Sequence, residues 1–221
     1  MRLIDTMRAF VLELAETGSK GYRWLVTAAR YQDIATGRFV AEKTVLRRVD
    51  KMNDEKVVSV KIGAITDRFI KDKGYKIQNW QEDMKRQLKD AFIINATIGR
   101  GGKNAMTPQD WGRVGGRLAY EYGRLNNFAA QIAKGEYSPE YIKNRASLYA
   151  GGPRTAYFDA LTRAKAGAGM SEERRILEPG ADHCGDCPDL AAMGWQPIGT
   201  LPEPGVGTEC GHRCRCSKEY R

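Results

Sequence analysis

Apolar residues recur at steps of three and four through most of the first 170 residues, and this spacing is typical of one face of an α-helix. Turns such as TGSKG and KDKGYK interrupt the pattern. The pattern predicts a mainly α-helical chain up to residue 170. The expected helices lie at about residues 3–16, 22–37, 38–52, 57–70 and 78–98.

The strongest helix signal begins at Thr107. Thr107 is a good N-cap, Pro108 suits the first helical position, and Asp110 favours the positive end of a helix. One apolar stripe then continues for about six turns, and Gly135 ends it. The stripe consists of Trp111, Val114, Leu118, Tyr122, Leu125, Ala129 and Ile132.

A similar start signal, Ser138-Pro139-Glu140, predicts the next helix. The run Gly151-Gly152-Pro153 is expected to break or kink that helix before RTAYFDALTRAKA resumes it. We interpret the aromatic residues on these stripes as core rather than as a stacking face for nucleic acid. They are Trp111, Tyr122, Phe128, Tyr141, Tyr149 and Tyr157.

The character of the chain changes near residue 170. Pro, Gly and Cys become frequent and the helical period is lost, although RRILEP favours a short strand. We therefore predict two domains, a helical body at residues 1–170 and a Cys/His-rich C-terminal module at residues 171–221. The predicted fold class is mainly α, with a multi-helix body followed by a small irregular module of the zinc-ribbon or knuckle kind.

All five cysteines and both histidines lie between residues 183 and 216. Thiolate and imidazole bind soft or borderline metals such as zinc. Cys184-x2-Cys187 has the spacing of one half of a tetrahedral site, and the second half must come from residues 210–216. A small module with few large apolar residues needs a stabilising cross-link, and a bound metal ion can supply it. The candidate metal ligands are Cys184, Cys187, Cys210, Cys214, Cys216 and His212.

Structural zinc is the favoured chemistry of this cluster, and disulfides, free thiols and an iron–sulfur cluster are its alternatives. A catalytic zinc would need an open coordination position and a general base, whereas acids beside a cysteine turn are usually turn-formers. A cysteine nucleophile paired with His183 or His212 lacks a scaffolded layout. The sequence has no His-Glu-x-x-His, zinc-deaminase, phosphate-loop or Gly-x-Ser-x-Gly motif, so we expect no enzymatic activity.

The net charge of +9 is unevenly distributed. Residues 1–170 contain 30 basic and 18 acidic side chains, whereas residues 171–221 contain six and nine. A basic body favours a polyanionic neighbour, either nucleic acid or an acidic protein surface. No run of five or six basic residues stands out, so a solvated basic surface is the alternative.

The chain lacks the signals of membrane insertion and secretion. No stretch approaches the ~18 consecutive apolar residues of a membrane span. Acidic residues interrupt the first 20 residues, and no small-residue cleavage site follows. We therefore expect a protein without membrane contact, made in a reducing cytoplasm, where clustered cysteines are metal ligands more often than disulfides.

The tail combines three features in order. A Cys-x2-Cys lies in HCGDCPDLAAMGWQPIG, a loop with Gly and Pro contains LPEPG, and a terminal motif with Cys-Arg-Cys lies in CGHRCRCSKEYR. In this arrangement the tail resembles the C-terminal module of bacteriophage minor head proteins, the head-morphogenesis family typified by the F protein of Mu-like phages. The helical segment from MTPQDW to ASLYAG is similar to virion proteins with this tail, so the resemblance covers about residues 104–221.

The family often has His-Pro-x-Cys-Arg-Cys near its end, whereas this chain has Cys-Gly-His-Arg-Cys-Arg-Cys. The histidine is one residue closer and an additional cysteine precedes it. This departure leaves open which of Cys210, Cys214, Cys216 and His212 complete a metal site.

The resemblance implies a structural virion protein, present in few copies near the portal, in the neck or on the inner face of the capsid, and assembled in the host cytoplasm. Its partners would be other phage structural proteins and further copies in an oligomer, with sequence-nonspecific contact to packaged DNA. A nucleic-acid-binding zinc-knuckle protein and a metal-dependent hydrolase are the alternatives. The acidic charge of the module weighs against the first, and the count of two histidines against the second.

Overall fold

The computed structural model describes residues 22–25, 30–33, 36–41 and 55–221. The chain forms two compact units, Met1–Met52 and Asn53–Arg221. The predicted domain boundary at residue 170 lies inside the second unit, where the C-terminal module and the helices are in contact. A domain division at that residue stays a prediction.

The first unit contains a three-stranded antiparallel sheet. Its strands are β1 (Tyr22–Leu25), β2 (Arg30–Asp33) and β3 (Phe39–Val40), in that order. The helix predicted over residues 22–37 is therefore wrong. Large aromatic residues alternate with polar ones here, and that pattern favours strands, with Trp24 opposite Tyr31 in the register.

Two further predicted helices fall largely outside the described residues. The segment at 3–16 lies wholly outside them. Of the segment at 38–52, the described part ends at residue 41 and contains β3, so no helix begins there. A few residues at a time, the sequence pattern here is compatible with both periods, and the described residues 22–25, 30–33 and 39–40 adopt the strand period.

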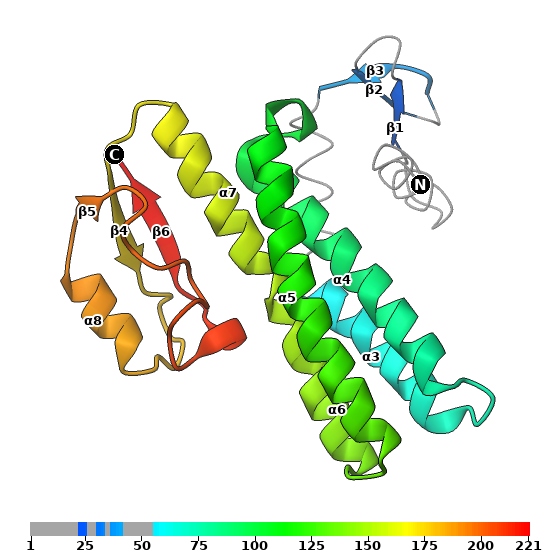
Figure 1. Ribbon diagram of the computed structural model, residues 1–221. Coiled ribbons are helices and arrows are strands. Elements are labelled where there is room, and N and C mark those ends of the chain that lie inside the picture. Colours follow the sequence, from blue (N-terminus) through cyan, green and yellow to red (C-terminus); the bar gives the residue numbers. More distant parts are fainter. Residues whose placement is uncertain (1–21, 26–29, 34–35, 42–54) are drawn as a thin grey trace. The chain divides into compact units, whose positions relative to one another are not determined.

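Helices form most of the second unit (Figure 1). They are α3 (Glu55–Lys71), α4 (Ile77–Arg100), α5 (Pro108–Ala133), α6 (Pro139–Ser147) and α7 (Pro153–Gly167), with the 3-10 turns η1 (Lys103–Ala105) and η2 (Leu148–Gly151). We call α3 to α7 the helix bundle. The helices predicted at 57–70, at 78–98 and from Thr107 and Ser138 are confirmed, as is the mainly α fold class with a cysteine-rich C-terminal module.

The centre of the helix bundle is α4, which packs against α3, α5 and α7. Trp80, Met84, Leu88 and Phe92 recur every four residues along α4, and each is at most 1% exposed. This spacing places them on one face of the helix, so that they form the middle of the apolar core. None of the helices in the described part of the chain is long and apolar enough to cross a bilayer.

The start of α5 is a capping box. The backbone N–H of Asp110 donates to Thr107 Oγ1, and the Asp110 carboxylate accepts the backbone N–H of Thr107. The same carboxylate accepts from Arg100 Nε at 3.0 Å and Arg163 Nε at 2.8 Å. Burial alone would raise the pKa of Asp110, but the hydrogen bonds from Thr107 and Arg163 and the charge of Arg100 lower it to about 2.

The predicted apolar stripe of α5 faces the core. Its buried members are Val114, Leu118, Leu125, Ala129 and Ile132. The stripe also contains a charged residue that the apolar pattern did not reveal, because Glu121 is only 5% exposed. Among the aromatic residues interpreted as core, Phe128 and Tyr149 are buried. That interpretation is wrong for Tyr141, which is 46% exposed and stacks on Tyr137 with ring centres 4.4 Å apart.

The break between α6 and α7 is confirmed. Ser138 caps α6 by accepting the backbone N–H of Tyr141, and η2 then leads through Gly152 to Pro153, the first residue of α7. A side chain at Gly151 would collide with the carbonyl of His212. Glycine is therefore required where the helix bundle meets the C-terminal segment.

The C-terminal module, residues 171–221, contains a second antiparallel sheet in the order β5-β4-β6. Its elements are β4 (Glu172–Ile176), α8 (Asp186–Ala192), β5 (Gln196–Pro197), η3 (Gly211–Arg213) and β6 (Ser217–Tyr220). The strand expected in RRILEP is present but begins two residues earlier than that segment and ends inside it. We call residues 171–221 the cysteine module.

The inner face of this sheet carries charged residues instead of apolar ones. Lys218 Nζ lies 3.0 Å from Glu173 Oε2 and 3.2 Å from Glu203 Oε1, and it donates to the carbonyl of Leu201. Glu173 accepts the backbone N–H of Leu201 at 2.9 Å. Burial raises the pKa of Glu203 despite the neighbouring Lys218. The loop before η3 is thus held to the sheet by buried ion pairs.

Candidate metal centre

Cys184 and Cys187 lie at the amino end of α8. The backbone N–H of Cys187 donates to the carbonyl of Cys184 at 3.3 Å, and this turn brings the two sulfurs within 3.6 Å of each other. Cys187 is buried, whereas Cys184 is partly buried. The Cys-x2-Cys spacing therefore brings two thiols together at the amino end of α8.

The second half is built around η3. Cys210 precedes this turn and Cys214 follows it, and the backbone N–H groups of Arg213 and Cys214 donate to the carbonyls of Cys210 and Gly211. One tight turn therefore places both thiols on the same side. The Sγ of Cys187 lies 3.6 Å from that of Cys210 and 3.8 Å from that of Cys214.

Cys187 is the centre of the whole group, which we call the thiol cluster. Its members are Cys184, Cys187, Cys210, Cys214 and Cys216. Cys187 belongs to both thiol triads in which all sulfurs lie within 4.8 Å of one another. All five thiols are free, and the separations of 3.6–3.8 Å exceed the disulfide bond length of about 2.05 Å. Zn–S bonds of about 2.3 Å would place tetrahedral ligands about 3.8 Å apart, which matches these separations.

The thiol cluster is largely closed to solvent. The exposed fractions of Cys187, Cys214 and Cys216 are 1%, 4% and 0%, and Leu177 packs against them. Burial, together with the neighbouring thiols, raises the pKa of Cys187. Without a cation this central thiol stays protonated, so a metal ion must displace its proton to bind the thiolate.

The two histidines lie in different places. His183 directs Nδ1 toward the Cys216 sulfur at 3.7 Å, and its Nε2 lies 3.1 Å from the carbonyl of Glu178. His212 faces away from the sulfurs, because its Nδ1 lies 3.2 Å from the carbonyl of Leu148 and its Nε2 lies 3.6 Å from Glu121 Oε1. The predicted thiol ligands are brought together, but His212 is not among them and His183 takes its place beside the cluster.

Two carboxylates at the rim of the cluster were not predicted as ligands. Asp186, Glu209 and the Cys184 sulfur form a third group of donors within 4.8 Å of one another. Asp186 Oδ2 also accepts the backbone N–H of Glu209 at 2.8 Å, which ties α8 to the segment before η3. The position of each acid next to a cysteine in the sequence is the available signal. On the sequence alone, Asp186 is interpreted as a turn-former and Glu209 is not considered.

Arg154 of α7 fixes the chain that carries the last two thiols. Its guanidinium donates to three successive carbonyls, those of Cys214 at 2.5 Å, Arg215 at 3.2 Å and Cys216 at 2.9 Å. Because three backbone acceptors share one rigid donor, the position of this segment relative to α7 is well defined. No sequence motif marked Arg154, since its partners are backbone atoms.

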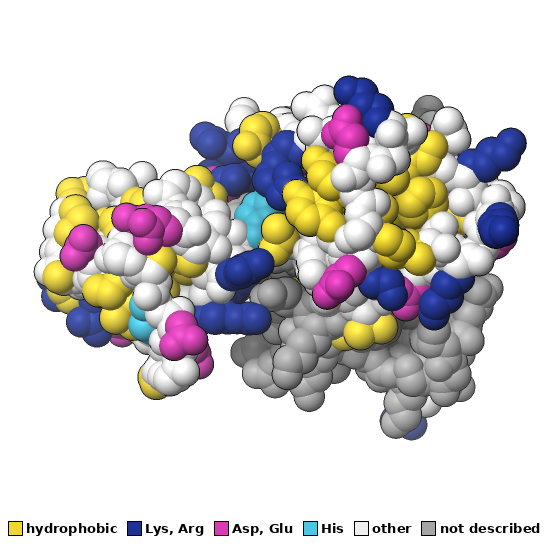
Figure 2. Space-filling view, turned by 90° about the horizontal axis from the view of Figure 1, so that it is seen from below, with side chains coloured by type: hydrophobic (Ala, Val, Ile, Leu, Met, Phe, Trp, Pro, Cys, Tyr) yellow, Lys and Arg dark blue, Asp and Glu magenta, His cyan; other side chains and the backbone are white. Residues whose placement is uncertain are grey.

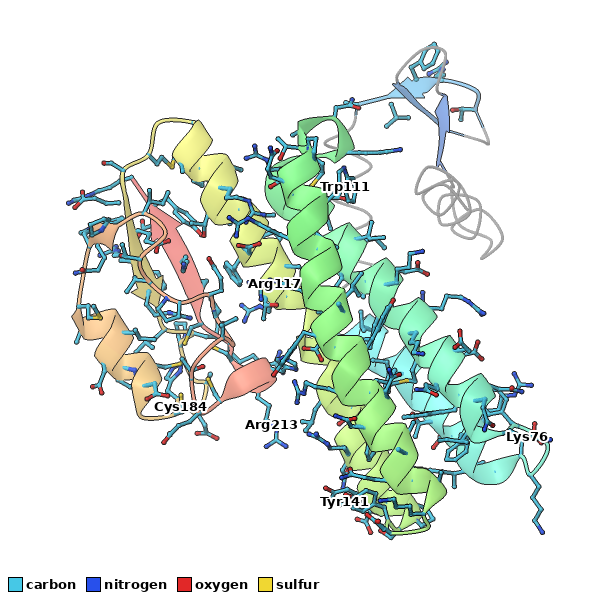
Figure 3. All side chains as sticks on the ribbon, in the orientation of Figure 1. Lys76, Trp111, Arg117, Tyr141, Cys184 and Arg213 are labelled. Atoms are coloured by element: carbon cyan, nitrogen blue, oxygen red, sulfur yellow. The ribbon has the colours of Figure 1, made fainter. Side chains whose placement is uncertain are left out.

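A cleft of about 840 Å³ separates α5 from the loop that leads into η3. Arg117, Arg124 and Arg213 line it together with Glu121 and His212. Figure 2 shows Lys and Arg side chains around a histidine where the cysteine module meets the helices. Figure 3 shows Arg117 on the side of α5 that is turned toward the module, and several sulfur atoms gathered near Cys184 within the module.

The chemistry of the thiol cluster is that of a binding site for a soft or borderline cation. Buried thiols predominate, and the nearest imidazole faces a sulfur. In comparisons with known proteins, no family model, curated protein or solved structure matches the chain. The proposal that this cluster binds a metal therefore rests on the residues of the site themselves.

Proposed function

We propose that the chain is a non-enzymatic structural protein of a bacteriophage head, located near the portal or neck, and that its thiol cluster binds zinc. The observation that carries the zinc assignment is the convergence of four buried or partly buried thiols on Cys187, three of them at 3.6–3.8 Å, the edge length of a zinc tetrahedron. The virion assignment is supported by the resemblance of the tail motifs, whose cysteines supply this convergence.

A structural role suits the donor set better than a catalytic one. Catalytic zinc sites keep a position open to water and usually combine histidine and carboxylate ligands. Here the central sulfur is 1% exposed, and four other thiols are gathered beside it. The ion would join the amino end of α8, the segment before η3 and the segment between η3 and β6.

The zinc assignment is tested by elemental analysis of freshly purified protein, combined with thiol titration before and after chelation. We expect zinc to copurify and at least four thiols to become reactive only after the chelator is added. Iron in place of zinc would point to an iron–sulfur cluster. Absence of metal together with few titratable thiols would point to disulfides and overturn the assignment.

The virion assignment is tested on particles. Nuclease-treated particles purified on a density gradient from a host that carries the gene are expected to contain the chain in few copies per particle, by quantitative mass spectrometry. Recovery only from the particle-free fraction would overturn the assignment. DNA binding with a steep salt dependence would then favour a nucleic-acid-binding protein, which the surplus of basic residues before residue 171 also suits.

A further inference from the structure

The thiol cluster contains more donors than one tetrahedral ion can use. Zinc in a structural site takes four ligands, whereas five thiols lie together here. The thiols form two triads. The outer triad, which is partly exposed, consists of Cys184, Cys187 and Cys210, and the inner triad, which is buried, consists of Cys187, Cys214 and Cys216. Only Cys187 belongs to both triads. A thiolate can bridge two metal ions, and the position of Cys187 is the one that such a bridge requires.

A fourth donor, His183, lies beside the inner triad, next to its Cys216 sulfur. His183 Nδ1 lies 3.7 Å from the Cys216 sulfur, close to the separation of about 3.6 Å expected for nitrogen and sulfur ligands on one zinc ion. His183 Nε2 lies 3.1 Å from the carbonyl of Glu178, which favours the proton on Nε2 and leaves the Nδ1 lone pair toward the sulfur. A hydrogen bond of this kind orients most histidines that bind metals.

Carboxylate donors lie beside the outer triad, next to its Cys184 sulfur. A carboxylate oxygen of Glu209 and one of Asp186 lie within 4.8 Å of the Cys184 sulfur. Glu209 is the better ligand, because Asp186 Oδ2 already accepts a backbone N–H at 2.8 Å, whereas the bond from the Gly185 N–H to Glu209 Oε2 is 3.4 Å long. The outer set is partly exposed and the inner set is buried.

We propose that the cluster binds two zinc ions that share the Cys187 thiolate. This inference rests on the proposed zinc binding and extends it. The inner ion is held by Cys187, Cys214, Cys216 and His183. The outer ion is held by Cys187, Cys184, Cys210 and Glu209. Seven donors would complete two tetrahedra with one shared corner once His183 and Glu209 close onto their triads, and every thiol of the chain would then have a metal partner.

The proposal is tested by counting zinc ions per chain in the full-length protein and in two histidine variants. We expect two zinc ions in the wild type. His183→Gln should lower the count to one, because it removes a donor of the inner ion. His212→Gln is the matched control and should keep two, since that ring faces Leu148 and Glu121. Cys216→Ser should resemble His183→Gln.

A second measurement on the wild type does not depend on how the variants fold. After replacement of zinc by ¹¹³Cd, the NMR spectrum should contain two cadmium resonances, split by coupling through the shared sulfur. One zinc ion in the wild type, with a single cadmium resonance and no change in His183→Gln, would overturn the second ion but leave the proposed zinc binding intact. No bound metal would overturn both proposals.

Discussion

The helix bundle buries apolar side chains at its centre, whereas the cysteine module buries sulfur and charge. Trp80, Leu88 and Phe92 fill the bundle, while the large side chains enclosed in the module include Glu173 and Arg175. Among residues 171–221, all of which the structure describes, Leu201 is the one buried side chain of the leucine, isoleucine and valine class. Apolar burial tolerates many changes of detail, but buried thiols and charges stabilise only when every partner is present.

The largest expected difference between the two regions concerns the metal. Chelation, or Cys187→Ser, should unfold the cysteine module and leave most of the far-UV helix signal, because a structural zinc supplies folding free energy of about 10 kcal/mol or more. Limited proteolysis should then cut residues 171–221 first. Met193→Ser, at a residue that is 52% exposed in the same module, is the control and should resist cleavage. Loss of helicity together with the module would contradict an independently stable bundle.

The buried ion pairs should give the next largest effect. Lys218→Met leaves Glu173 and Glu203 without their cation inside the module, and we expect a loss of about 4 kcal/mol in the free energy of unfolding. Urea titration of the metal-loaded protein measures it. Adding Glu173→Leu should recover part of the loss. If Lys218→Met alone were neutral, the network would contribute little to holding the module.

A core truncation in the bundle should cost somewhat less. Leu88 is fully buried, and Leu88→Ala should lower the free energy of unfolding by about 3 kcal/mol through lost apolar contacts and a residual cavity. Val60→Ala, at a residue that is 71% exposed, should change it by less than about 0.5 kcal/mol. The loss of unfolding free energy in Leu88→Ala should be the same with and without metal. If a chelator changed this loss strongly, the stability of the bundle would depend on the cysteine module, against the difference between the two regions.

The lowered pKa of the Asp110 carboxylate should make the free energy of unfolding of the bundle depend on pH in the acid range. Its folded pKa of about 2 lies below the ordinary value of 3.8, so its contribution is complete above about pH 4 and is lost as the pH falls toward 2. The shift corresponds to about 2 kcal/mol. The difference in unfolding free energy between the wild type and Asp110→Asn should therefore shrink over this pH range. A constant difference would exclude this role of the charge.

The contact between the two regions should give the smallest effect. Arg154→Lys keeps the positive charge but loses the planar donor that reaches three carbonyls, and we expect a cost of about 1 kcal/mol. Arg145→Lys, on α6, is a suitable control for the chemical change alone. Equal effects of the two substitutions would show that the Arg154 contacts do not hold the module.

The sequence predicted the parts of the fold in which local signals and packing agree. The cap at Thr107 and the stripe from Val114 to Ile132 gave α5, because capping groups and periodicity are both local properties. The same approach failed at residues 22–37, where aromatic residues are compatible with either period over a short stretch. Strand pairing decides such cases, and pairing is not visible in one segment.

The candidate site was predictable by residue type but not in its details. The cysteines identified the thiol cluster, because all five lie in one short segment of the chain. The choice between the two histidines depends on backbone direction, because one 3-10 turn directs His212 to the bundle while His183 precedes the turn at Cys184. Charged residues on β4 likewise gave no hint that they face inward.

The guanidinium of Arg154 binds the carbonyls of the very segment that carries Cys214 and Cys216. Ordering this segment costs conformational entropy once, whether a cation or the helix bundle orders it first. For the proposed zinc site the two events would be reciprocally coupled, and the bundle would raise the affinity for the ion by the factor by which the ion strengthens docking. A severed module would therefore hold the proposed ion more weakly than the whole chain does.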